Sequence, residues 1–174
     1  MTLSSSVKYK YSYFEHLVLT RIRGEPTYET LRHLKNELKA NARSVPTTFE
    51  GGNHGYLGIL LTPGEYHCIM TSNPFTWEPK PGVLIPNPSG TVTQIAIAED
   101  THCLTKQIYL ETLVLEQTII QKIIKSVDTK YLATLRNSVT GKITPLIPTI
   151  LNFLHNNYGH ITLQQLDNKT TTVK

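Results

Sequence analysis

A long apolar-rich stretch in the second half of the chain limits the possible folds most. It predicts one helix from about Ala98 to Ser126. Its apolar positions recur at helical spacing, in one stripe and a second set that widens it: Leu104, Ile108, Leu115, Ile119 and Ile123, then Leu110, Leu113, Val114, Ile120, Ile124 and Val127. Interspersed charged and amide residues argue against a membrane span. A helix apolar around so much of its girth is buried against several neighbours or meets another subunit. We expect it to be the central core element.

Shorter helices are expected on both sides of this element. The first begins near Pro26 or Thr27 and ends at Val45-Pro46, because the residue before proline avoids the helical region. A second runs from Pro63 to Met70, with Thr62 as its N-cap. The sequence therefore predicts a mostly α fold, an irregular helical bundle.

Three further helix starts follow the long helix. Asp128 can cap a short helix that carries Tyr131, Leu132 and Leu135. Thr144-Pro145 then predicts an N-cap followed by proline, and Gly159 a C-terminal stop. Thr162 and Gln165 fit a capping box that opens one more helix. Because this helix reaches only Leu166, we expect the natural domain to continue beyond it.

The remaining segments predict connections and ends. Residues 1–23 form an N-terminal arm, either a strand or disordered, and residues 167–174 form a polar tail. The glycine cluster Gly51, Gly52, Gly55 and Gly58 predicts a tight connection, since no phosphate-loop motif is present. Residues 72–93 form a proline-rich loop. In that loop, Phe75 and Trp77 either anchor it to the body or offer a contact to a partner.

Basic residues gather in the first quarter of the chain. The net charge of the whole chain is +4. Such a cluster could contact nucleic acid through non-specific electrostatics, or it could be a solvated face with half of its charges balanced. The solvated face is the favoured interpretation, because overall charge is a weak indicator of nucleic-acid binding. The candidate contact residues are Arg21, Arg23, Arg32, Lys35, Lys39 and Arg43.

No pattern in the sequence indicates catalysis or a cofactor. The two cysteines, Cys68 and Cys103, predict reduced core thiols and an intracellular protein. The seven histidines lack metal-site spacing, and no nucleophile elbow is present. We therefore expect no enzyme, no metal, no small-molecule substrate and no contact with a membrane. No apolar run follows Met1, so a signal peptide is not expected.

Two blocks of sequence resemble a known family. The string GEPTYETLRHLKNELKANARSVP, followed by GGNHGYLGILLTPGEY, resembles the opening of Gag-like polyproteins of copia-type retrotransposons. A second block, KYLATLRNSVTGKITPLIPTILNFLHNNYGHITLQQL, resembles a later part of the same proteins. Together the resemblance covers residues 19–166, with the Gag-like domain starting at residue 24 and ending at residue 166.

The resemblance implies a capsid-like helical domain that self-associates into virus-like particles around element RNA. No catalytic residues are implied, because the enzymes of such elements lie in other parts of the polyprotein. The chain departs from a complete Gag protein in lacking the CxxCxxxxHxxxxC zinc knuckle that often grips RNA. The alternative function is a non-catalytic nucleic-acid-binding module that uses the basic residues between positions 21 and 43.

Overall fold

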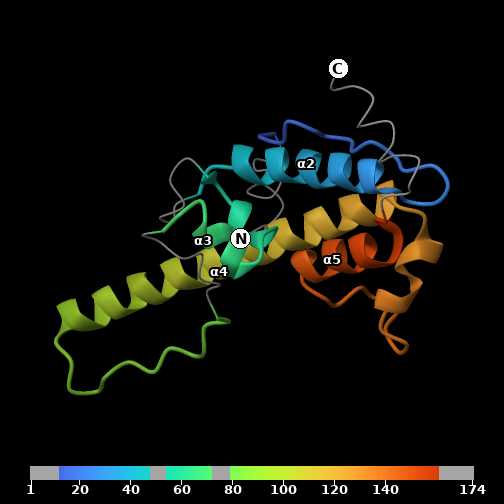
Figure 1. Cartoon of the computed structure of the whole chain (residues 1–174). Helices are drawn as coiled ribbons and strands as arrows, with labels where there is room; N and C mark the ends of the chain where they lie inside the picture. Colours follow the sequence, from blue (N-terminus) through green and yellow to red (C-terminus); the bar gives the residue numbers. More distant parts are fainter. Residues whose placement is uncertain (1–11, 48–53, 72–78, 161–174) are drawn as a thin grey trace.

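The computed structural model describes residues 12–47, 54–71 and 79–160 (Figure 1). Within these ranges the chain is helical and no strand forms, although an isolated antiparallel bridge joins Arg136 to Ile143. The mostly α prediction is confirmed. The elements are α2 (Tyr28–Ser44), η2 (Leu57–Ile59), α3 (Pro63–His67), α4 (Val92–Ser126), η3 (Thr129–Leu135) and α5 (Ile147–Tyr158), where η denotes a 3-10 helix.

Helix α2 begins and ends where its sequence predicts. The Thr27 side chain accepts a hydrogen bond from the Thr30 N–H, and the Thr30 hydroxyl oxygen accepts one from the Thr27 N–H. This reciprocal capping satisfies backbone groups that the first turn leaves without helical partners. Val45, the residue before Pro46, is extended and ends the helix.

Helix α4 is longer and less buried than predicted. Its 35 residues start at Val92, six positions before Ala98, because Thr91 and Gln94 form a capping box within the predicted proline-rich loop. Its buried residues all lie between Thr112 and Ser126, and none of residues 92–107 is buried. Leu104, expected in the core, is 55% exposed. Only the C-terminal half of α4 is therefore a core element.

Two other helix predictions need correction. The predicted N-cap at Thr144 is wrong, because α5 begins at Ile147 with Leu146 as its N-cap. A start at Thr144 would require Pro148 to donate the first helical hydrogen bond, and proline has no N–H. The short helix after Asp128 forms as a 3-10 helix, with the Asp128 carboxylate accepting from the Lys130 N–H. Gly159 ends α5 as predicted.

The core lies where α2, α5 and the C-terminal half of α4 meet (Figure 1). Helix α5 contacts both α2 and α4, and η3 packs against α5. Edge-to-face ring pairs reinforce these contacts, with Tyr28 against His155 and Tyr131 against Tyr158. Side chains that are less than 2% exposed include Leu34, Leu38, Ile59, Ile119, Ile123, Leu132, Ile147, Ile150 and Leu154.

Residues 12–27, which we call the strap, cross this core without regular structure. The predicted strand does not form in residues 12–23, and residues 1–11 of the predicted arm lie outside the described ranges. Phe14, Leu19 and Ile22 of the strap are nevertheless buried in the core. The predicted helix at Thr162 and the polar tail also lie outside the described ranges.

Gly55 allows the chain to turn closely against the end of α2. Its φ angle is +51°, and a Cβ atom there would lie 2.5 Å from the Arg43 carbonyl oxygen and 2.7 Å from that of Ala42. The next residue, Tyr56, donates its N–H to the same Ala42 carbonyl at 2.9 Å and is 1% exposed. The predicted tight connection is confirmed at Gly55, whereas Gly51 and Gly52 lie outside the described ranges.

The substitution Gly55→Ala should therefore destabilise the protein severely. Gly24→Ala is the matched control, because Gly24 also has a positive φ angle, +79°, but has open space around it. We expect Gly24→Ala to lower the free energy of unfolding by about 1–2 kcal/mol from backbone strain alone. Gly55→Ala adds a backbone clash, so its loss should exceed about 4 kcal/mol. Urea unfolding measures both; equal losses would contradict the close approach.

Candidate functional site

The strap is fixed to α2 by a fully buried amide. The His16 N–H donates to Asn41 Oδ1 at 2.7 Å, and Asn41 Nδ2 donates to the His16 carbonyl oxygen at 2.9 Å. Asn41 is 0% exposed, so losing either bond would leave a buried polar group unpaired. This pair therefore determines how the strap lies along α2.

One helical turn earlier, a buried carboxylate holds the strap a second time. The Thr20 N–H and hydroxyl both donate to Glu37, at 3.0 and 2.7 Å. Burial raises the pKa of Glu37, but these two bonds and the neighbouring His33 and His16 outweigh it and lower the pKa below its usual value. The ionised form of Glu37 therefore stabilises the folded state.

Lys122 of α4 ties the strap to the other side of the core. Its ammonium donates to the His16 carbonyl oxygen at 3.1 Å and to the Leu17 carbonyl oxygen, and it lies 5.0 Å from the centre of the Phe14 ring. Burial, with a smaller effect from Lys125, lowers the pKa of Lys122. At the end of α4, the Ile22 N–H donates to the Ser126 carbonyl oxygen at 2.8 Å.

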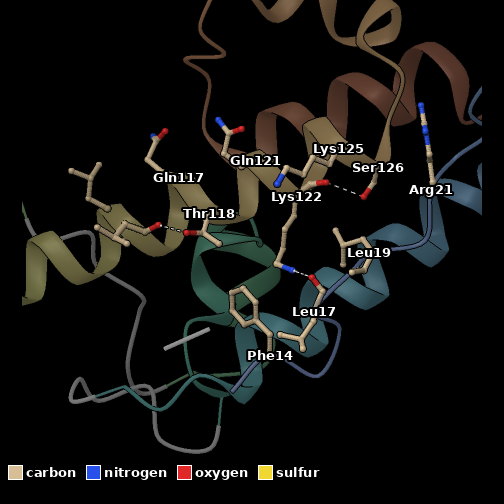
Figure 2. Close-up of a pocket in the computed structure, with 13 residues that line it drawn as sticks. Phe14, Leu17, Leu19, Arg21, Gln117, Thr118, Gln121, Lys122, Lys125 and Ser126 are labelled. Carbon is tan, nitrogen blue, oxygen red and sulfur yellow. Dashed lines mark hydrogen bonds between the residues drawn. The ribbon is translucent and has the colours of Figure 1, made fainter. Parts of the chain in front are cut away.

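Between the strap and α4 lies a groove of about 860 Å³ (Figure 2). Figure 2 shows Lys122 reaching from α4 to the Leu17 carbonyl beneath it. Its cationic rim consists of Arg21, Lys122 and Lys125, and its described lining contains no acidic residue. The apolar lining residues are Phe14, Leu17, Val18, Leu19, Leu113 and Val114. This surface suits an apolar segment that carries negative charge.

A second exposed feature is the N-terminal half of α4, which extends away from the other helices (Figure 1). Its side chains Val92, Ile97 and Leu104 are 86%, 60% and 55% exposed. Val83 and Ile85, in the segment that leads into α4, are also strongly exposed. Several large apolar side chains exposed on one segment are a feature of contact surfaces.

The six predicted basic contact residues do not form one surface. Arg21 and Arg23 lie on the strap outside α2, and Arg21 is on the rim of the groove. Arg32 pairs with Glu29 at 2.9 Å on the exposed surface of α2. Three residues do share one face at four-residue spacing: Lys35, Lys39 and Arg43.

Within this basic row, Lys35 is partly neutralised. Its ammonium lies 2.9 Å from the Glu65 carboxylate, which also caps α3. Burial raises the pKa of Glu65, but the Thr62 N–H and Lys35 lower it to about 2. Burial and the positive charge of Lys35 lower the pKa of Lys39, with a smaller effect from Arg43. Lys39 and Arg43 therefore remain the two members of the row that form no ion pair with another described residue.

The remaining sequence predictions concern the aromatic loop residues, the cysteines, and metal or membrane binding. Phe75 and Trp77 lie outside the described ranges. The buried-thiol prediction is wrong, because Cys68 and Cys103 are both exposed, Cys103 on the extended half of α4. Among the described residues, no group of three metal-binding side chains comes together, and no helix is long and apolar enough to cross a bilayer.

Sequence reasoning missed the groove. Its two walls come from residues about 100 positions apart, which no local pattern brings together. The available signals were weak: Leu113 and Val114 widen the apolar stripe of α4, and Lys122 and Lys125 interrupt it.

Comparison with known proteins adds no relative, since no family model, no curated protein and no solved structure matches the chain. Function is therefore inferred from the geometry of this molecule. Its three candidate features are the groove, the extended half of α4 and the basic row on α2.

Two buried glutamates should respond to pH in opposite directions. Glu37 has a lowered pKa, so its stabilisation is present above about pH 4.5 and is lost as the pH falls through its folded pKa. Burial raises the pKa of Glu116, which is 7% exposed on α4, so its contribution is favourable below about pH 4.5 and is lost as the pH rises.

At pH 7, Glu37→Gln should lower the free energy of unfolding by about 1–3 kcal/mol, because the Thr20 bonds to a charged acceptor are lost. Glu116→Gln should raise it at pH 7, because it removes an ionised buried group. Both differences should shrink towards pH 4. Thermal unfolding from pH 4 to 7 measures them, and changes of the same sign in the two variants would refute this assignment.

Proposed function

We propose that this chain is a structural, self-associating protein of the Gag capsid type found in copia-type retrotransposons. One observation carries the proposal: half of the longest helix extends from the core with large apolar side chains in water. Fully burying a valine, leucine or isoleucine side chain contributes about 1.5–3 kcal/mol each. Contacts between copies would recover this free energy for Val92, Ile97 and Leu104.

The helical architecture supports the same proposal. The first block that resembles copia-type Gag proteins spans α2, η2 and α3, and the second spans η3 and α5. Both blocks contribute to one core through the contact between α2 and α5. In this proposal the domain works through its contacts and uses no catalysis, and assemblies of it enclose element RNA as virus-like particles.

Removing apolar groups from the extended half of α4 tests this function. The double substitution Ile97→Asn and Leu104→Asn should leave the fold intact, because both side chains are exposed. We expect it to weaken self-association at least about tenfold, the effect of losing a central interface contact. Light scattering across a concentration series measures the mass, and negative-stain microscopy shows whether particles form.

The control for this test is Val139→Asn. Val139 is 90% exposed but lies in the turn between η3 and α5, away from the extended half of α4. Its substitution should leave association unchanged. A wild-type protein that stays monomeric at high concentration would refute the proposed function.

The basic row on α2 favours nucleic-acid binding as the second candidate function. Lys35, Lys39 and Arg43 recur every four residues, so they can follow a line of phosphates. Within the described part of the chain, Lys39 and Arg43 form no ion pair, whereas Lys35 already binds Glu65 and Arg32 already binds Glu29. Binding through this row would be electrostatic and independent of base sequence.

The double substitution Lys39→Glu and Arg43→Glu tests this second function. It should weaken binding to single-stranded RNA and reduce the slope of log affinity against log salt by about 1.4, since two phosphate contacts are lost. The double substitution Arg23→Glu and Lys142→Glu changes the charge equally, on the strap and in the turn before α5, and should have a smaller effect. Fluorescence anisotropy at several salt concentrations measures both. Equal effects, or no binding at low salt, would exclude the row.

A further inference from the structure

The groove described above has room for a short helical segment. A volume of about 860 Å³ can accept several side chains from one face of a docked helix. Apolar side chains form its walls, and the strap residues Leu17 and Val18 are 66% and 86% exposed. Arg21, Lys122 and Lys125 line it, with no acidic residue among the described lining. A matching segment would therefore be apolar on one side and negatively charged.

The extended half of α4 has these properties. Ile97, Asp100 and Leu104 occupy positions i, i+3 and i+7, so they lie on one face over two turns of helix. All three are exposed, and Glu99 adds a second negative charge beside Asp100. We call residues 97–104 the tip. Helix-in-groove recognition uses anchors at this spacing.

A molecule cannot place its own tip in its own groove. The groove wall contains Leu113, Val114 and Lys122, which belong to the same continuous helix as the tip. The centres of the tip and of this wall are about 19 residues apart along α4, or about 29 Å at 1.5 Å per residue. A helix does not fold back on itself, so the tip can reach a groove only on another molecule.

We propose that the tip of α4 in one copy docks into the groove of a second copy. Ile97 and Leu104 would enter between the strap and α4, and Asp100, which shares their face, would lie near Arg21 and Lys125. This inference rests on the proposed self-association and specifies its contact surfaces. A single contact leaves one free tip and one free groove. Reciprocal docking of these two would close a dimer, and docking of further copies would produce rings or open chains.

The test uses two complementary variants of the full chain. The tip variant carries Ile97→Asn and Leu104→Asn and keeps an intact groove. The groove variant carries Arg21→Glu and Lys125→Glu, two exposed residues, and keeps an intact tip. Lys122 is left unchanged because its ammonium holds the strap. Circular dichroism and thermal unfolding confirm that each variant is folded before masses are compared.

At low salt, wild-type protein should associate into dimers or larger assemblies as its concentration rises, as measured by light scattering. Each variant alone should be at least about tenfold weaker in self-association. An equal mixture should form a one-to-one complex and stop there, because only one working tip and one working groove meet. Lys142→Glu, an exposed charge reversal in the turn before α5, should associate like wild type.

Charge reversal of the tip provides a rescue. Adding Asp100→Lys to the groove variant should restore self-association, because the charges of the two docking surfaces are complementary again. A groove variant that associates like wild type, or a mixture that forms no complex, would overturn the docking while leaving self-association intact. A monomeric wild type would overturn both the docking and the proposed function.

Discussion

The buried pair between Asn41 and the His16 backbone is the constraint on which the rest of the structure depends. It joins a segment without regular structure to α2 through two hydrogen bonds in a place that water does not reach. Glu37 and Lys122 then hold the neighbouring residues Thr20 and Leu17. Polar groups of this kind specify a position more strongly than apolar packing does, because any other position leaves them unpaired. Phe14 and Ile22 enter the core as a result.

The two halves of α4 lie in different environments: the C-terminal half is in the core and the N-terminal half is exposed to solvent. The C-terminal half contributes Ile119 and Ile123 to the core and Leu113 and Val114 to the groove. The N-terminal half has no buried residue between positions 92 and 107 and keeps large apolar side chains in water. Because one helix carries both halves, the positions of the exposed surface and the groove are rigidly related. Helix α4 thus contributes both to the stability of the fold and to the proposed contacts between copies.

Local patterns in the sequence were sufficient for most helix ends and insufficient for tertiary placement. Thr62 and Asp128 cap their helices as predicted, because capping depends on neighbours two or three residues away. Periodicity could not show that Leu104 is exposed, since the same spacing describes a core face and a contact face. The groove could not be predicted, because Asn41 and Lys122 hold the strap through its backbone carbonyl oxygens. Every residue has such an oxygen, so the sequence gives no sign of this contact.

The continuous helix α4, Val92–Ser126, also has a mechanical consequence. The helix is a stiff rod about 52 Å long. Copies linked end to end could therefore flex only where the tip of one helix enters the groove of the next copy. The curvature of such an assembly would then depend on the angle between the strap and helix α4. A small shift of the strap against Lys122 would be amplified over the length of each α4 helix and would change the radius of the assembly substantially.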